Sequence, residues 1–149
     1  MTISVRRARA GDIPALRALY LSARRETFVW QPAAAFQLAD FDMQTRDEWQ
    51  WIAEHDGELA GFISLWEPDR FIHHLYVDRS RHRRGVGGAL LRALPDWPAT
   101  RYRLKCLCAN GAALAFYRAC GFAEIGAGTA DDGDYLLLES GGDGRPPFA

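Results

Sequence analysis

The sequence is poor in the residues from which disulfide frameworks and structural metal sites are built. Its 149 residues include four histidines and three cysteines, Cys106, Cys108 and Cys120, which show no CxxC spacing. An odd number of cysteines without the spacing of metal ligands argues against both disulfides and zinc. We therefore expect small, buried, unreactive thiols and no bound metal.

Long apolar runs and an excess of one charge are also absent. No run approaches the roughly 20 apolar residues that span a bilayer, and the N-terminal stretch MTISVRRARAGD lacks the apolar core of a secretory signal. The 18 Lys and Arg residues are balanced by 19 Asp and Glu residues, whereas general nucleic-acid binders usually carry a basic excess. These absences predict a cytoplasmic protein that has neither nucleic acid nor membrane as a partner.

The hydrophobic periodicity that the sequence does contain is typical of one mixed α/β domain. A chain of this length suits a single core. Strands are expected over 3–6, 48–54, 58–66, 71–77, 102–107, 122–125 and 135–139, and helices over 13–25, within 28–41, over 85–94 and over 110–119. No repeat or linker interrupts this order, so the domain is expected to cover 1–140. The last ten residues are rich in Gly and Pro, so 141–149 are expected to form a flexible tail.

The most informative stretch joins the strand over 71–77 to the helix that follows it. From residue 75 to 91 it reads LYVDRSRHRRGVGGALL. Glycines before a helix let an anion approach backbone N–H groups that have no partner within the helix. Arg79, Arg81, Arg83 and Arg84 surround the same point and suit phosphate geometry. The stretch therefore predicts a phosphate-binding loop, and the alternative is a basic turn that is merely solvated.

Two common phosphate motifs do not fit this loop. A P-loop requires Lys and then Ser or Thr directly after its last glycine, and neither follows here. A dinucleotide-binding fold requires a third glycine three residues after the second, where this chain has Leu90. The stretch instead resembles motif A of the GNAT superfamily, the acyl-CoA-dependent N-acetyltransferases. That motif consists of Gln or Arg, two residues, Gly, any residue, and Gly or Ala. Gly85 and Gly87 match it, and His82 stands where the family usually has Gln or Arg.

A second stretch, NGAALAFYRACGF over 110–122, is similar to motif B of the same family. In that motif an Asn precedes a helix that carries Phe-Tyr, with Gly-Phe about four residues beyond. The resemblance covers the chain from the first strand to about residue 139, with both motifs in the family's order. It implies an α/β fold with a mixed, mostly antiparallel sheet of about seven strands, which is splayed between the fourth and fifth strands and flanked by about four helices.

The resemblance implies acetyl-CoA as the acyl-donor co-substrate, bound in the gap between the strands over 71–77 and 102–107. Strand backbone would hold the pantetheine arm and polarise the thioester, and loop amides would hold the pyrophosphate. Asn110 would contact the cofactor, cap its helix, or do both. The cofactor-binding residues implied in this way are Leu75, Tyr76, Val77, Arg83, Arg84, Gly85, Val86, Gly87, Gly88, Asn110 and Tyr117.

The choice of catalytic groups depends on how the amine substrate loses its proton. An ammonium group has no lone pair, so a general base or a chain of waters must remove its proton. The family's catalytic carboxylate would stand at Phe71 and is therefore missing here. We favour His73 as the base, with His74 and Glu67 as alternatives, and expect the two histidines on opposite faces of the strand. Each histidine can equally pack in the sheet or bind substrate. By the resemblance, Tyr117 protonates the departing thiolate, and the alternative is a core tyrosine.

Acceptor specificity is expected to depend on 28–47 and on a loop over 126–134. Phe28, Trp30 and Trp66 are predicted to line an apolar acceptor pocket, and the aspartates of the loop to attract a cation. The alternatives are core aromatics and a solvated acidic loop.

The resemblance thus implies an N-acetyltransferase. It would move an acetyl group from acetyl-CoA to a primary amine of a small molecule, peptide or protein by direct attack in a ternary complex. The alternative is a CoA-binding sensor or interaction module that kept the fold and lost turnover, which the missing carboxylate and His82 suggest. A nucleotide-binding protein of another fold is disfavoured by the motif mismatch. Strand edges and aromatic residues on the surface would allow a homodimer.

Overall fold

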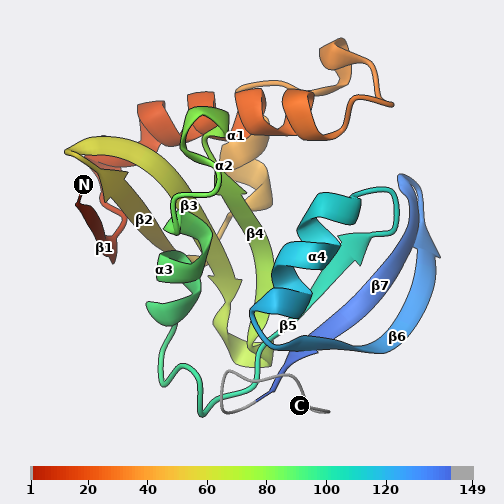
Figure 1. Cartoon of the computed structure of the whole chain (residues 1–149). Helices are drawn as coiled ribbons and strands as arrows, with labels where there is room; N and C mark the ends of the chain where they lie inside the picture. The colour runs from red at the N-terminus through yellow and green to blue at the C-terminus, as the bar shows by residue number, and fades with distance from the viewer. Residues whose placement is uncertain (1, 142–149) are drawn as a thin grey trace.

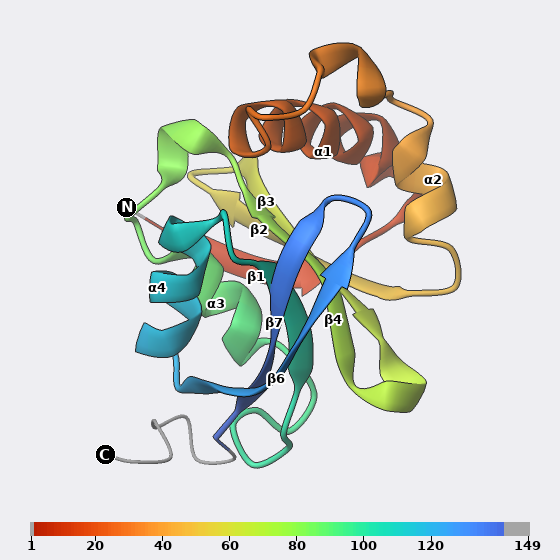
Figure 2. The same ribbon diagram turned by 90° about the vertical axis from the view of Figure 1, so that its right-hand side faces the viewer.

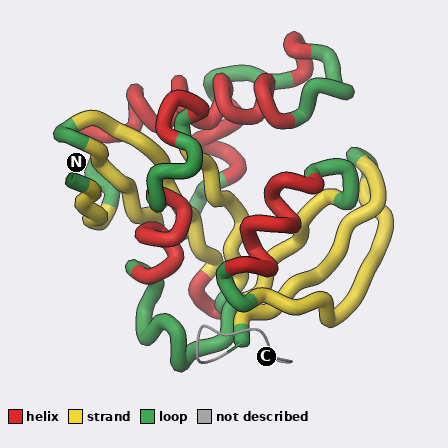
Figure 3. Tube along the Cα trace, viewed as in Figure 1, coloured by secondary structure: helices red, strands yellow, loops and turns green. Residues whose placement is uncertain are grey.

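The computed structural model describes residues 2–141, which form one sheet with helices on both faces (Figure 1). Figure 3 colours the elements by type, and their order is β1 (Ile3–Arg7), α1 (Ile13–Thr27), α2 (Asp40–Gln44), β2 (Trp49–His55), β3 (Glu58–Trp66), β4 (Phe71–Val77), α3 (Val86–Arg92), β5 (Arg103–Leu107), α4 (Gly111–Ala119), β6 (Phe122–Ala130) and β7 (Gly133–Ser140). No helix in this described part is long and apolar enough to cross a membrane. The predicted tail over 141–149 lies, apart from Gly141, outside the described residues.

The sheet has seven strands in the order β1-β2-β3-β4-β5-β7-β6. Neighbouring strands are antiparallel except for β4 and β5, which run parallel. These two strands pair only where Phe71 lies opposite Arg103, beside a hydrogen bond of 3.0 Å from the Arg103 N–H to the Arg70 carbonyl, and then diverge (Figure 1). The structure therefore confirms the predicted mixed sheet and its splay between the fourth and fifth strands.

Two apolar clusters cover the two faces of the sheet. α1 and α2 lie across one face, as Figure 2 shows. The cluster beneath them comprises Leu16, Leu19, Tyr20, Phe41, Ile52 and Phe62. The three residues from α1 follow the spacing of one helical face, which is why this helix packs flat on the sheet.

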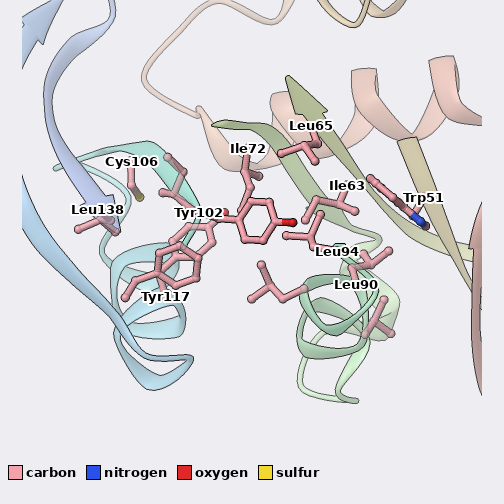
Figure 4. Packing of buried hydrophobic residues seen from close by; sticks show 14 of the residues in the cluster. Trp51, Ile63, Leu65, Ile72, Leu90, Leu94, Tyr102, Cys106, Tyr117 and Leu138 are labelled. Carbon is pink, nitrogen blue, oxygen red and sulfur yellow. The ribbon is translucent and has the colours of Figure 1, made fainter. Parts of the chain in front are cut away.

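The larger cluster, on the other face, joins the two halves of the splayed sheet. It contains residues of β2, β3 and α3 together with residues of β5, β7 and α4. Figure 4 shows the labelled residues of both halves on either side of Tyr102: Trp51, Ile63 and Leu90 on one side, and Cys106, Tyr117 and Leu138 on the other. The Tyr102 hydroxyl donates to the Pro95 carbonyl. A shared core thus holds the halves together although their strands barely pair.

The structure differs from expectation at two segments. The short helix predicted within 28–41 is a 3-10 turn at Ala33–Ala35 followed by α2, which begins only at Asp40. The loop predicted over 126–134 instead belongs to the β6–β7 hairpin, with a turn between Ala130 and Gly133. Small residues such as Gly128 give a weak strand signal, but a Cβ there would lie 2.5 Å from the Tyr135 hydroxyl oxygen. Residues 126–130 therefore adopt a strand conformation because they pair with β7.

The three cysteines are free but not equally buried. Cys106 is buried in β5, Cys120 is half-buried at the end of α4, and Cys108 is exposed. Burial raises the pKa of Cys106 to about 11. The expectation of buried thiols is therefore confirmed for Cys106 and wrong for Cys108, which lies just beyond the end of β5 at Leu107.

Candidate active site

The loop that joins β4 to α3 turns at two residues with left-handed backbone. Arg83 has a φ of 64° and Gly85 a φ of 83°, and α3 begins directly afterwards at Val86. Gly85 is the N-cap residue and has no side chain to cap the first N–H groups of α3, which have no acceptor within the helix. This geometry suits the predicted pyrophosphate contacts, whose role stays a prediction.

Arg81 and His82 connect this loop to neighbouring strands. The Arg81 guanidinium contacts Asp78 at 3.0 Å and Glu58 at 2.7 Å, and His82 Nε2 donates to the Val77 carbonyl at 2.9 Å. These contacts tie the loop to the start of β3 and to the end of β4. Of the four arginines expected around an anion, Arg81 therefore holds the loop in place, and the other three are exposed.

The second glycine of the motif has a packing role. A Cβ on Gly87 would lie 2.8 Å from Cζ of Phe116 on α4, a distance shorter than van der Waals contact. α3 and α4 can approach each other this closely only because residue 87 has no side chain. The sequence suggested phosphate access as the reason for the glycines, and the structure adds close helix packing at this one.

The residues predicted to hold pantetheine lie along an open strand edge. On one side, Leu75, Tyr76 and Val77 pair with β3. On the other side, β4 and β5 have already separated after their single pairing. Strand N–H and C=O groups alternate between the two sides, so some of those in this stretch face the gap. The structure thus places all three residues beside the splay.

Tyr117 lies on α4 with 9% of its surface exposed. Its ring packs on Phe122 with centroids 5.5 Å apart, and burial raises its pKa well above the usual tyrosine value. Burial also raises the pKa of Tyr76, and the charges of Tyr20 and Tyr117 raise it further. Leu75 and Val77 of β4 pack against the core cluster that contains Tyr117, and Tyr117 keeps its proton at neutral pH.

Asn110 caps α4, as one of its two expected roles requires. Its Oδ1 accepts a hydrogen bond of 3.2 Å from the Ala113 N–H. This N-cap role is confirmed, and the contact of Asn110 with the cofactor stays a prediction.

A β-bulge changes where the two histidines point. His74 pairs with Ser64 on β3, whereas Ile72 already pairs with Leu65, so His73 is an extra residue in β4. The two imidazole rings have centroids 5.9 Å apart. The expectation that they lie on opposite faces is wrong, because the alternation of side chains with period two fails at a bulge.

Both histidines lie beside the carboxylate of Glu48, which precedes β2. His73 Nδ1 contacts Glu48 Oε2, and His74 Nε2 lies 4.0 Å from Glu48 Oε1. The Ser64 hydroxyl donates to Oε1 at 2.5 Å. The Glu48 side chain is only 3% exposed, whereas that of His73 is 42% exposed. The site thus combines a buried carboxylate with an imidazole that solvent can reach.

The His74 ring is packed within the protein. Its Nε2 donates to the Gln44 carbonyl at 3.0 Å, and its ring lies between Tyr20 and Tyr76, with centroids 5.2 Å and 6.4 Å away. Burial lowers the pKa of His74 to about 4. His74 is therefore a neutral ring whose Nε2 proton is donated to a carbonyl, and this arrangement suits a packing role better than a role in proton transfer.

Sequence reasoning missed Glu48. It proposed Glu67 as the carboxylate alternative, but Glu67 is exposed in the turn between β3 and β4. Residue 48 is the first residue of a predicted strand and belongs to no motif. No local spacing connects it with His73, since the register of β2, β3 and β4 brings them together.

The residues predicted to line an acceptor pocket are only partly brought together. Phe28 and Trp30, between α1 and α2, have ring centroids 5.4 Å apart, and Trp30 is 44% exposed. Trp66 lies at the end of β3 opposite Phe71 and does not share the ring contacts found here for Phe28 and Trp30. An acceptor role for these aromatics stays a prediction.

The turn of the β6–β7 hairpin carries the predicted acidic residues. Asp131 and Asp132 form its tip, and the charge of Asp132 is among those that raise the pKa of Tyr76. Asp134 accepts a hydrogen bond of 2.8 Å from the Thr129 hydroxyl. A role of this acidic segment in attracting a cation stays a prediction.

Comparison with known proteins places this geometry in a family. The sequence model of the acetyltransferase (GNAT) family matches residues 13–122. The peptidyl-lysine N-acetyltransferase YiaC of Escherichia coli (strain K12) is 28% identical over 137 residues, which cover 86% of this chain and 88% of that protein.

Solved structures share the fold. The apo form of YjaB from Escherichia coli superposes with a TM-score of 0.75 at 24% identity, covering 95% of this chain and 99% of that one. The PaiA N-acetyltransferase of Thermoplasma acidophilum, in complex with coenzyme A, gives a TM-score of 0.74 at 18% identity over 94% and 99% of the two chains. The splayed sheet, the glycine loop and the matched sequence agree, and the chain belongs to the acetyltransferase (GNAT) family of acyl-transferring enzymes.

Proposed function

We propose that this protein transfers an acetyl group from acetyl-CoA to a primary amine, with the lysine side chain of a peptide or protein as the favoured acceptor. The observation that carries the proposal is the open edge of β4, which leads directly into the glycine loop. Leu75 and Val77 of this strand also pack against the core cluster that contains Tyr117. The relative that acts on peptidyl-lysine supports the acceptor class, and the CoA complex of a structural neighbour supports the donor.

Acetyl-CoA would lie along this edge. The pyrophosphate would meet the N–H groups of residues 83–88, beside the exposed side chains of Arg83 and Arg84, because uncapped N–H groups bind anions. The pantetheine arm would follow Leu75, Tyr76 and Val77, with a backbone N–H polarising the thioester carbonyl. The near-neutral net charge of the whole chain does not oppose this, because four of its arginines, Arg79, Arg81, Arg83 and Arg84, are gathered at this loop.

The reaction needs two proton transfers. The neutral amine attacks the thioester carbon, the C–N bond forms, and the C–S bond breaks. His73 Nε2 would accept the proton that leaves the attacking nitrogen, and Tyr117 would give its phenolic proton to the departing sulfur. Both groups then exchange protons with water. The raised pKa of Tyr117 keeps this proton in place until the thiolate forms.

A CoA-binding module without turnover is the second candidate, since Phe71 stands where the family's carboxylate would be. The Glu48–His73 contact weakens this alternative because it supplies a base by another route.

Binding and turnover should be measured separately. Calorimetry with acetyl-CoA tests the donor site, and mass spectrometry of a lysine peptide incubated with acetyl-CoA tests transfer. A mass readout is needed because the exposed Cys108 would react with thiol reagents that detect free CoA. The same peptide with its lysine amine blocked is the matched control.

We expect Tyr117→Phe to bind acetyl-CoA normally and to lose about 10²-fold in kcat, a typical contribution of a general acid. Absence of acetyl-CoA binding by the native protein would refute the proposal. Tight binding without acetylation across lysine, N-terminal and polyamine acceptors would identify the non-catalytic module instead.

A further inference from the structure

The carboxylate of Glu48 is held from two sides inside the protein. The Ser64 hydroxyl, on a residue with no exposed surface, donates to Oε1 at 2.5 Å. Oε2 contacts Nδ1 of His73. The backbone N–H of Glu48 also donates to the Thr45 carbonyl at 3.1 Å. A side chain fixed in this way presents one oxygen to His73 in a constant direction.

The partners of each ring determine where the protons are. A carboxylate oxygen only accepts, so Nδ1 of His73 carries the proton and Nε2 keeps the lone pair. The His73 side chain is 42% exposed, so this nitrogen can meet a substrate from solution. In His74 the order is reversed, because Nε2 faces the Gln44 carbonyl and must donate. The two neighbouring histidines are therefore opposite tautomers.

We infer that Glu48 is a positioning residue, which holds His73 in the tautomer that can act as a base and stabilises the imidazolium formed when His73 takes the amine proton. Ser64 anchors Glu48 for this task. The inference rests on the proposed function, since it assigns a role in that reaction to a residue outside both family motifs. A buried carboxylate that orients an imidazole performs the same service in other enzymes that use histidine as a base.

A divalent metal is the competing occupant of this cluster. Glu48, His73 and His74 each offer a donor atom, and these atoms lie within 4.8 Å of one another. A metal requires an unprotonated ring nitrogen, whereas Nε2 of His74 is used as a donor to Gln44. A metal would have to break that hydrogen bond, so the hydrogen-bonded arrangement is favoured.

The first test is spectroscopic and needs neither cofactor nor turnover. Long-range ¹⁵N–¹H correlation spectra of the full chain at pH 8 should show His73 mainly as the Nδ1–H tautomer and His74 as the Nε2–H tautomer. In Glu48→Gln, the Nδ1–H fraction of His73 should fall to less than half. Glu54→Gln is the matched control, because Glu54 lies on β2 and pairs with Arg6 at 2.9 Å, away from the histidines. It should leave the His73 tautomer unchanged.

The second test is kinetic. Glu48→Gln should lower kcat by about 10²-fold or more, as expected when a base loses its orienting group, and leave KM for acetyl-CoA within twofold. Ser64→Ala should lower kcat by a smaller factor, and Glu48→Asp should recover part of the activity. Glu54→Gln should retain native kcat.

The outcomes separate the inference from the proposed function. A His73 tautomer that is the same in native protein and in Glu48→Gln overturns the inference even if the enzyme is active. If Glu48→Gln does not fold, the same comparison with Ser64→Ala and Glu48→Asp decides it. A Glu48-dependent tautomer in a protein that acetylates nothing refutes the proposed function and the catalytic role together. One equivalent of divalent metal by elemental analysis, whose removal by chelator shifts the His73 signals, also overturns the inference.

Discussion

His74 should make the protein sensitive to mild acid. Its ring lies between Tyr20 and Tyr76 and gives its Nε2 proton to the Gln44 carbonyl. Burial lowers its pKa from the ordinary value near 6.5 to about 4, although the hydrogen bond to the Gln44 carbonyl acts in the opposite direction. Between about pH 4 and pH 6.5, His74 is therefore mostly neutral in the folded state and mostly protonated in the unfolded chain.

The size and sign of the effect follow from the two pKa values. Because the folded value is the lower one, the unfolded state binds more protons below pH 6.5, and stability is lost as the pH falls from about 6.5 to about 4. Between pH 7 and pH 5 this amounts to about 2 kcal/mol, with about 1.4 kcal/mol for each pKa unit. Carboxylates with lowered pKa, such as Asp12 and Asp40, add losses at lower pH, because unfolded aspartates titrate near pH 4.

Urea unfolding at pH 7 and pH 5 measures this difference. The native protein should lose about 2 kcal/mol more than His74→Gln over the same interval, since the variant lacks the titrating ring. His82→Gln removes an exposed histidine and should follow the native protein. If native protein and His74→Gln lose the same free energy, then His74 is not held neutral by burial and the reasoning is refuted.

Two further predictions concern packing and thiol chemistry. Gly87→Ala should lower the free energy of unfolding by about 1–3 kcal/mol, because the new Cβ meets Phe116 at 2.8 Å. Urea unfolding of Gly87→Ala with and without Phe116→Leu tests this, and a single variant as stable as the native protein would contradict it. Iodoacetamide at pH 7.5 should alkylate Cys108 and spare Cys106, which is buried with a pKa raised to about 11. Peptide mapping by mass spectrometry gives the order of reaction, and equal rates at both sites would show that β5 opens in solution.

Local patterns in the sequence were sufficient for most of the fold. The apolar stripe on α1 and the apolar strand around Phe62 can be predicted from the sequence, because helix and strand periodicities depend on near neighbours in the chain. The glycine loop and the Asn110 helix could be matched to family motifs for the same reason. The β6–β7 hairpin was less legible, since its residues from Gly126 to Ala130 are small and acquire their strand conformation by pairing with β7.

The arrangement of the candidate site depends instead on contacts between distant segments. Glu48 and His73 are 25 positions apart, and the register of three strands brings them into contact. The bulge opposite Ser64 and Leu65 turns both histidines toward one carboxylate. The residue spacing within β4 does not predict this bulge. Residue types and local periodicity thus established the family resemblance, the strands and the loop. Which imidazole is open to solvent, and which carboxylate contacts it, was decided by strand register and burial, because these are properties of the assembled sheet.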